Sequence, residues 1–416
     1  MLLYVGIIIT YILRMALNLA IIPVGDRMKW DDSTRGVLLS AFYWGYILTQ
    51  VPGGWLAKKY GAKIIFGWGI ASASLLTIIW PLTLFNFELS VIVRVLTGIG
   101  EGVTFPAAYH LIALWYPKTE KSTISASVTI APSIGTVIAN GLSPLVIDYL
   151  RWESIFYLAG GIGVIWSIFW LLLVIDYPTD RRSLSIFLPS EEEIEYIKSH
   201  QDRDDNHAAA TKVSIKKIVT EPAFICIMIN HFSYNWGYYV FASWLPTYLK
   251  KELNFDLDAA GIISILPYFL MTLVGIPSGY FADKLAAKRV ARLIVIRKTF
   301  QMLGTVLPAF FLILLCSIPN LSVTGAVTIM FAALSTAPFT TAGHSSNFVD
   351  ISTKYCGLLF SISNVGATVP GIVGVYFTGF ILTETNNWNI VFLLAASLYI
   401  LGAASFLFFA KVDKID

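Results

Sequence analysis

Two ionisable side chains, Arg94 and Glu101, lie within an apolar stretch of the sequence that is long enough to cross a membrane. Their spacing of seven residues places both on one face of a helix, about 10 Å apart along its axis, which is too far for a direct ion pair. A charge in the hydrocarbon core of a bilayer costs at least about 2.5 kcal/mol, so each group needs a partner in the protein interior or in a water-filled cavity. Arg94 can hold an anion, whereas Glu101 can take up and release a proton.

A third charged group, Arg14, lies in the first apolar stretch together with the polar side chain of Asn18. An arginine stays protonated, so it must hold a counter-ion or donate hydrogen bonds to an anion. The residues alone also allow purely structural roles. Arg14 could form a fixed ion pair between helices or extend to the membrane surface, and Arg94 could form a permanent salt bridge.

Glu101 has a structural alternative as well, as a carboxylate tied to the hydroxyl groups of Thr104 or Tyr109. Its helix also carries Gly98 and Gly102, which form a face of two small residues four positions apart. Such a face allows a neighbouring helix to approach closely. The sequence therefore predicts a tightly packed helix with one charged side.

In the second half of the chain, polar and aromatic side chains gather between residues 229 and 246. His231, Tyr234, Asn235 and Tyr238 have spacings that let several share one helix face, which favours a pore-lining role. Tyrosines at a membrane surface are the alternative. Further along, His344 and Asn364 could line the same pore, or could only join helices by hydrogen bonds.

The composition places the chain in a bilayer. Of its 416 residues, 56% are hydrophobic and only 13% are charged, whereas soluble domains carry about 25% charged residues. The formal charge of +3 is too small to indicate a nucleic-acid partner. Because the sequence has no nucleotide-binding, metal-ligand or nucleophile motif, we expect neither enzymatic activity nor a cofactor or metal. The three cysteines have no metal-ligand spacing and are expected to be free thiols.

Twelve apolar stretches have the length of membrane-spanning helices, which predicts an all-α membrane protein with two halves of six helices. The expected helices cover about residues 2–24, 34–56, 64–84, 88–113, 123–148, 153–175, 221–249, 257–282, 291–317, 322–345, 354–382 and 388–411. We expect an N-terminal half over 1–175, a linker with a short surface helix over 176–217, and a C-terminal half over 218–416.

The positions of the 29 lysines and arginines predict the orientation. With twelve spans, most of them fall in loops on the side of the two termini. Because positive loops stay in the cytosol, both termini are expected to be cytosolic. The first helix begins almost at Met1, so no separate signal peptide is expected ahead of it.

An internal repeat supports two related halves. The second helix is followed by GGWLAKKYGAK at 53–63, and the eighth by SGYFADKLAAK at 278–288. Parallel six-helix halves are typical of the major facilitator superfamily, whose members bind substrate where the halves meet. The repeated loop resembles the signature of that superfamily. Its acidic position is occupied by Asp283 in the second copy and by Lys58 in the first, so we expect a gating or structural role for this pair of loops.

Longer segments carry a more specific resemblance. They are FYWGYILTQVPGGWLAKKYGAK, RVLTGIGEGVTFPAAYHLIALWYPKTEKS and FVDISTKYCGLLFSISNVGATVPGIVGVYFTGFIL. These segments are similar to the anion/cation symporter branch of the superfamily, solute carrier family 17. The resemblance implies that Arg14 and Arg94 belong to an anion site and that Glu101 is the protonatable coupling group.

The sequence thus predicts a monomeric secondary transporter of a small anion, driven by a proton or sodium gradient through alternating access. The family resemblance favours inorganic phosphate, with an acidic sugar or another carboxylate as the second choice. Tyr234 stands where glutamate carriers of the family have an arginine, which argues against glutamate. An anion channel and a transporter-like receptor are two further alternatives.

Overall fold

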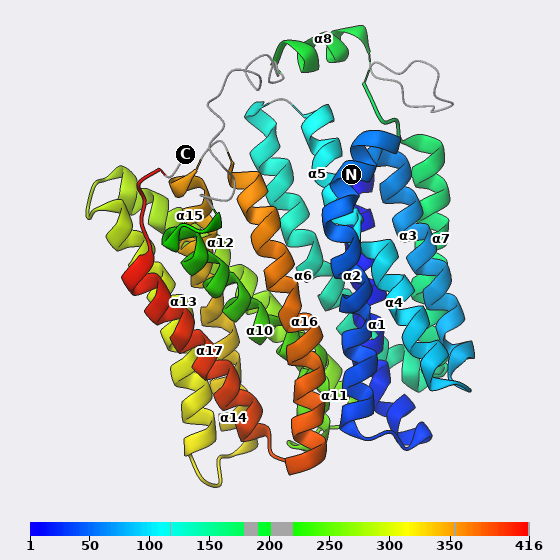
Figure 1. Cartoon of the computed structure of the whole chain (residues 1–416). Helices are drawn as coiled ribbons and strands as arrows, with labels where there is room; N and C mark the ends of the chain where they lie inside the picture. The colour runs from blue at the N-terminus through cyan, green and yellow to red at the C-terminus, as the bar shows by residue number, and fades with distance from the viewer. Residues whose placement is uncertain (117, 179–189, 201–218, 353–354, 415–416) are drawn as a thin grey trace. The chain divides into compact units, whose positions relative to one another are not determined.

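The computed structural model describes residues 1–116, 118–178, 190–200, 219–352 and 355–414 (Figure 1). The described residues form two compact units. The first unit contains Met1–Val24 and Ala41–Thr211, and the second contains Gly25–Ser40 and Lys212–Asp416. In this division the segment 25–40 groups with the second unit and not with its sequence neighbours. The expected boundaries of the two halves and the linker stay a prediction.

The first half of the chain folds into the expected helices. They are α1 (Leu2–Met28), α2 (Asp32–Tyr60), α3 (Ala62–Ile79), the 3-10 helix η1 (Trp80–Thr83), α4 (Phe87–Gly102), α5 (Thr104–Trp115), α6 (Lys118–Tyr149) and α7 (Glu153–Leu173). The short surface helix expected in the linker is α8 (Glu191–His200), while much of the rest of that linker lies outside the described residues.

The second half is likewise helical. Its elements are α10 (Pro222–Lys251), α11 (Leu257–Ile263), α12 (Leu266–Ala287), α13 (Leu293–Ser317), α14 (Val323–Thr336), η3 (Ala337–Thr341), α15 (His344–Ile351), α16 (Cys356–Thr385) and α17 (Trp388–Phe409). Each of the twelve expected ranges coincides with one helix or with an interrupted helix, so the all-α prediction is confirmed.

Four of the expected continuous helices are interrupted. The range 64–84 passes from α3 into η1, and the range 88–113 divides at Val103 into α4 and α5. The range 257–282 divides into α11 and α12, and the range 322–345 passes through η3 before α15. Apolar periodicity does not reveal the breaks between α4 and α5 or between α11 and α12, because the pieces on both sides remain hydrophobic. Among the described residues, ten segments are long and apolar enough to cross a membrane, and α2 and α10 add 29 and 30 residues of less apolar helix.

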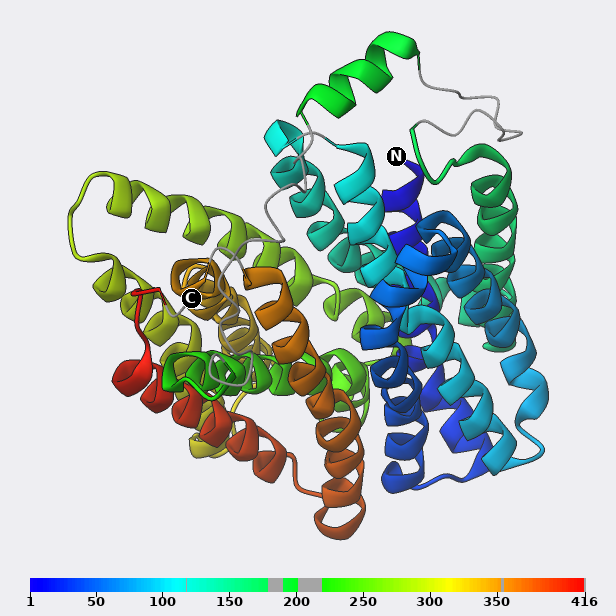
Figure 2. The same cartoon turned by 45° about the horizontal axis from the view of Figure 1, so that its top comes forward.

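Aromatic packing holds each unit together. In the first unit α3 packs along α7, where the ring centroid of Phe66 lies 5.8 Å from Trp166 and 4.8 Å from Trp170. In the second unit α10 packs against α16 and α17, and α17 also packs along α13. Figure 2 shows the red α17 from a second angle.

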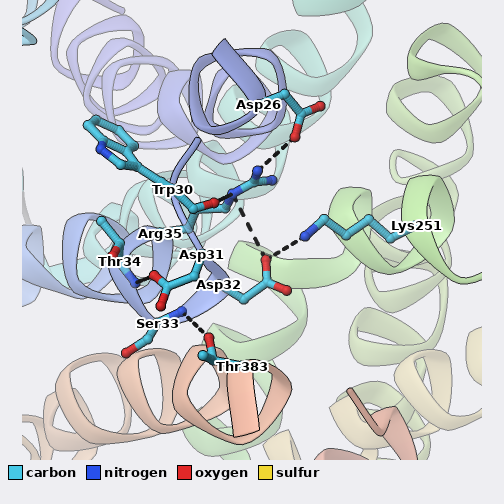
Figure 3. A network of polar contacts seen from close by, with 9 residues as sticks. All are labelled: Asp26, Trp30, Asp31, Asp32, Ser33, Thr34, Arg35, Lys251 and Thr383. Atoms are coloured by element: carbon cyan, nitrogen blue, oxygen red, sulfur yellow. Dashed lines mark hydrogen bonds and ion pairs between the residues drawn. The ribbon is translucent and has the colours of Figure 1, made fainter. Parts of the chain in front are cut away.

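The segment 25–40 is held by a network of polar contacts (Figure 3). The buried Arg35 binds the Asp26 carboxylate through its Nη2 atom at 2.7 Å. Its Nε atom donates to the main-chain oxygen of Trp30 at 3.1 Å and lies 3.9 Å from Asp32 Oδ1. Lys251, at the end of α10, binds the other side of this network through Asp32 at 2.6 Å. One carboxylate is therefore shared between a cation of its own segment and a cation of α10.

The same segment packs closely against α16. The main-chain N–H of Ser33 donates to the Thr383 hydroxyl at 2.7 Å (Figure 3). A Cβ atom at Gly379 would overlap the main-chain oxygen of Asp32, and one at Gly36 would lie 3.1 Å from that of Tyr376. Glycine at these positions lets the two helices touch through their backbones.

Candidate functional site

The centre of the first unit contains a buried ion pair between α1 and α4. Arg14 and Glu101 are 3% and 0% exposed, and the Arg14 Nη2 atom lies 3.3 Å from Glu101 Oε2. The Arg14 Nε atom donates to the same oxygen at 3.4 Å. Arg14 thus has a partner on another helix, and Glu101 lies in the last turn of α4, whose C-terminal end favours a nearby cation.

Three aromatic rings surround the Arg14 guanidinium. Its Cζ atom lies 4.5 Å from the ring centroids of Tyr11 and Phe42 and 4.6 Å from that of Tyr46. Aromatic faces attract a cation, most strongly where water is excluded. We did not predict these residues from the sequence, although Tyr11 precedes Arg14 by one helical turn and Phe42 precedes Tyr46 by four residues.

Arg94 is the second buried cation of this unit. It is 3% exposed, and its Cζ atom lies 5.6 Å from the Phe42 ring centroid. Among the described residues, the Arg94 Nε atom has no hydrogen-bond acceptor and Glu101 Oε1 has no donor. Two guanidinium groups and one carboxylate give the cluster a net charge of +1, so it can accept an anion, and Glu101 can accept a proton.

The break between α4 and α5 lies two residues after Glu101. The Thr104 hydroxyl donates at 2.6 Å to the main-chain oxygen of Glu101, and not to its carboxylate. The structural alternative in which Thr104 holds the carboxylate is therefore not found. In membrane transporters, interrupted helices commonly line the substrate or ion site, because the freed backbone groups then face a polar cavity.

Gly98 and Gly102 lie where α4 meets α2. A Cβ atom at Gly98 would overlap the main-chain oxygen of Phe42, and one at Gly102 would overlap the Thr49 hydroxyl. The same close approach brings Phe42 and Tyr46 of α2 next to the charged face of α4. The small-residue face thus positions the aromatic rings around the arginines.

The other predicted site residue of α1, Asn18, is 5% exposed and its Nδ2 atom lies 3.0 Å from the Met15 sulfur. Lys58, near the end of α2, and Asp283, on α12, are both exposed. Substrate binding by Asn18, and the structural role expected for Lys58 and Asp283, stay predictions.

In the second unit, the predicted residues of α10 are buried, as His231 and Asn235 are, or half-buried, as Tyr234 and Tyr238 are. The rings of Tyr234 and Tyr238 stack with centroids 6.4 Å apart. The Asn235 side chain donates to the main-chain oxygen of His231 at 2.9 Å, so it is already bonded within its own helix. Asn364, on α16, is half-buried. The predicted role of these residues as substrate ligands stays a prediction.

Residues 3–349 match the sequence model of the Major Facilitator Superfamily. A solved structure of a bacterial homologue of the human lysosomal transporter Spinster has a TM-score of 0.75 to this chain at 15% identity, and covers 99% of this chain and 97% of its own. At that identity the likeness establishes the fold, which is the one predicted from the sequence.

Relatives of known name are similar over nearly the whole chain. Human sialin is 34% identical over 392 residues, which are 93% of this chain and 77% of sialin. The chloroplastic ascorbate transporter of Arabidopsis thaliana is 32% identical, over 97% of this chain and 72% of its own. The chloroplastic sodium-dependent phosphate transport protein 1 of the same plant is also 32% identical, over 97% and 76%.

Proposed function

This chain belongs to the major facilitator superfamily, and we propose that within it the chain is an ion-coupled symporter of small anions, with inorganic phosphate as its most favoured substrate. Its similarity to these relatives indicates a multi-pass membrane transporter of anions. The single observation that carries the proposal is Arg94, a buried guanidinium whose Nε has no acceptor among the described residues, beside an ion pair that leaves the cluster one positive charge in excess.

Arg94 is the primary anion ligand in this proposal. Arg14 already has Glu101 as its counter-ion, whereas Arg94 has a donor free for a carboxylate or phosphate oxygen. A charge-assisted hydrogen bond contributes about 1.5–3 kcal/mol, so losing one lowers affinity roughly 10- to 150-fold. The planar guanidinium suits both anions, because each can accept two parallel N–H groups.

Coupling follows from a change of partner at Arg14. When Glu101 takes up a proton it no longer neutralises Arg14, and the cluster charge rises from +1 to +2. Arg14 can then join Arg94 in binding the anion. Proton and anion binding support each other, because each is favoured by the charge that the other brings.

Movement of the bound anion proceeds by alternating access, in which the two halves expose the site first to one side of the membrane and then to the other. We propose that both termini are cytosolic, since the lysines and arginines concentrate in the loops on their side, and that the transporter works as a monomer. Either the proton or a sodium ion can be the driving ion, and Glu101 suits the proton directly.

The relatives support two substrate classes. The phosphate transport protein supports phosphate, while sialin and the ascorbate transporter support an organic anion as the second candidate. Arg94 and Arg14 suit the charged group of either class. The two substrate classes differ in the part of the molecule that carries the charged group. We propose that side chains such as Tyr234 and Tyr238 contact that part and so select the substrate.

A panel of anions separates the candidates. Purified protein is heated with phosphate, sialate, glucuronate, ascorbate, urate or a dicarboxylate, and the melting temperature is measured, since a ligand that binds only the folded state raises it. Phosphate is expected to give the largest rise in the wild type and almost none in Arg94→Ala. If a sugar acid raises the melting temperature of the wild type more than phosphate does, phosphate is not the favoured substrate. If phosphate raises the melting temperature of Arg94→Ala as much as that of the wild type, Arg94 is not the anion ligand.

A voltage-driven current through the reconstituted protein, without exchange of labelled for unlabelled anion, would favour the channel alternative.

A further inference from the structure

Each unit has an interrupted fourth helical segment with a titratable side chain beside the interruption. In the first unit it is α4/α5, which breaks at Val103 next to Glu101. In the second unit α14, η3 and α15 form the segment, and His344 is the first residue of α15. Interruptions at corresponding positions of the two halves of a transporter indicate its binding region.

Each of these side chains also faces a basic residue of the first helix of its unit. Glu101 meets Arg14 of α1, and His344 meets His231 of α10, with the two imidazole ring centroids 5.8 Å apart. His344 is 2% exposed and His231 9%. The two units thus place a pair that contains a titratable side chain at the same position of their folds.

A chain of buried amides fixes where His344 carries its proton. The Asn230 Nδ2 atom donates to the main-chain oxygen of Cys226 at 2.8 Å, and the Gln301 Nε2 atom donates to Asn230 Oδ1 at 2.7 Å. Gln301 Oε1 then accepts the main-chain N–H of His344 at 2.8 Å and faces His344 Nδ1 at 3.2 Å. Each oxygen in this chain accepts only, so Nδ1 of His344 must bear the hydrogen.

The neutral imidazole of His344 therefore keeps an unprotonated Nε2 atom. The hydrogen of the neutral His231 ring can lie on either nitrogen, because its Nδ1 atom lies 2.9 Å from the Ser363 hydroxyl, which can donate or accept. Two protonated imidazoles at this ring distance would repel each other. The pair can hold one added proton but not two.

The neighbouring helices leave this pair free of other charges among the described residues. α10 contributes Tyr234, whose ring centroid lies 6.3 Å from His344, and α16 contributes Phe360 at 5.7 Å from His231. On α13 and α15, Arg297 and Asp350 are bound to each other at 2.7 Å, and Lys298 of α13 donates to the main-chain oxygen of Leu407 at 2.7 Å. Titratable hydroxyls further out are those of Tyr238 on α10, Tyr268 on α12 and Tyr399 on α17.

We propose that His231 and His344 form a second proton-binding site, the counterpart in the second unit of the Arg14–Glu101 pair in the first. A proton adds to Nε2 of His344 and is shared with the His231 ring and the aromatic faces beside them. Because His344 begins α15, whose N-terminal end disfavours a cation, the proton is held weakly and leaves again, as a coupling site requires.

Histidine NMR tests this site independently of transport. The chain has only 5 histidines, so ¹⁵N-labelled protein in lipid nanodiscs gives few signals, and loss of a signal in His344→Gln assigns it. At about pH 8 the His344 ring should carry its hydrogen on Nδ1, and one proton should add to the pair on the way to about pH 5. A hydrogen on Nε2, or a ring that stays neutral throughout, overturns the proposal.

Transport provides the second test, and this part rests on the proposed function. Anion accumulation under an imposed pH gradient should fall about tenfold in His344→Phe and in His344→Gln, with a flattened pH profile. The matched control is His110→Phe, which changes a histidine of α5 outside both pairs and should leave the profile unchanged. Full, pH-dependent accumulation in both His344 variants overturns the coupling role. If the wild type moves no tested anion, the proposed function fails, while the NMR result still decides the proton site.

Discussion

Arg94 and Arg14 are both buried cations of the first unit, but their surroundings give them different chemistry. Arg14 has a carboxylate and three aromatic rings around it, whereas the Arg94 Nε atom lacks an acceptor among the described residues. A buried donor left without a partner costs about 1–3 kcal/mol, more if charged. In the proposed function, this cost is removed when an anion binds to Arg94.

The substitution Glu101→Gln tests anion binding separately from proton coupling. Glutamine keeps an oxygen that can accept from Arg14, but it cannot exchange a proton. We therefore expect labelled anion still to exchange across the membrane, while accumulation driven by a pH gradient falls to the equilibrium level. The measurement is uptake into liposomes with and without the gradient. Accumulation equal to that of the wild type would rule out Glu101 as the coupling group.

Asp176, which follows α7, gives a prediction for the pH dependence of stability. Burial raises the pKa of its carboxyl, although the main-chain N–H of Lys63 donates to it at 2.6 Å. A raised carboxyl pKa in the folded state means that this group favours folding at acid pH, and that the advantage is lost as pH rises through the folded pKa.

Asp176→Asn should therefore raise the melting temperature at neutral pH, because the amide oxygen can still accept from Lys63 without a buried charge. The gain over the wild type should shrink as the pH is lowered below the folded-state pKa of Asp176. Melting curves across this range check the sign, and a neutral-pH melting temperature below that of the wild type contradicts it.

Candidate site residues could be predicted from the sequence where a charged side chain lies in an apolar stretch. Arg14, Arg94 and Glu101 stand out for this reason, and the structure brings Arg14 and Glu101 together. The spacing of Arg94 and Glu101 already excluded a direct ion pair between them. It could not be predicted that Arg14 is the partner of Glu101, since that depends on how α1 lies against α4. The aromatic rings around Arg14 were missed because Tyr and Phe are common in any membrane helix.

At the scale of elements, Gly98 determines how closely α4 approaches α2. Gly98→Ala should destabilise the protein by about 1–3 kcal/mol, because a methyl group there would overlap the main-chain oxygen of Phe42. Gly161→Ala, on α7, is the matched control, since a Cβ atom there meets nothing within 4 Å. Melting temperatures of the two variants measure the difference. Equal effects would show that α2 and α4 do not need the close approach.

The docking of the segment 25–40 offers a test of movement. Ser33→Cys and Thr383→Cys replace two residues joined by a 2.7 Å hydrogen bond, in a background without the three native cysteines. If the contact opens during alternating access, a short thiol crosslinker should stop anion uptake in the double variant, and each single variant should be unaffected. Uptake at the uncrosslinked rate in fully crosslinked protein would show that this contact stays closed throughout the cycle.

The number and order of helices could be predicted from apolar length, but the interruptions and the docking could not. The breaks at Val103 and at η3 have no strong sequence signal, because proline and glycine also occur inside unbroken membrane helices such as α16, which contains Pro370. Backbone contacts far apart in sequence, such as that of Asp32 with Gly379, depend on tertiary packing.

For the molecule as a whole, the repeat at 53–63 and 278–288 predicted two related halves. In the structure, residues 25–40 group with the second unit, where Lys251 and Thr383 bind the start of α2 at Asp32 and Ser33. The halves are thus alike in helix order, and each has a pair with a titratable side chain at the same position.

The most direct test of the central claim is accumulation of labelled phosphate in liposomes under an imposed proton or sodium gradient, with the wild type beside Arg94→Ala. We expect the wild type to concentrate phosphate above equilibrium, and Arg94→Ala to lose roughly 10-fold or more of that uptake, the equivalent of one charge-assisted hydrogen bond. Accumulation by Arg94→Ala at the wild-type level would show that Arg94 is not the anion ligand.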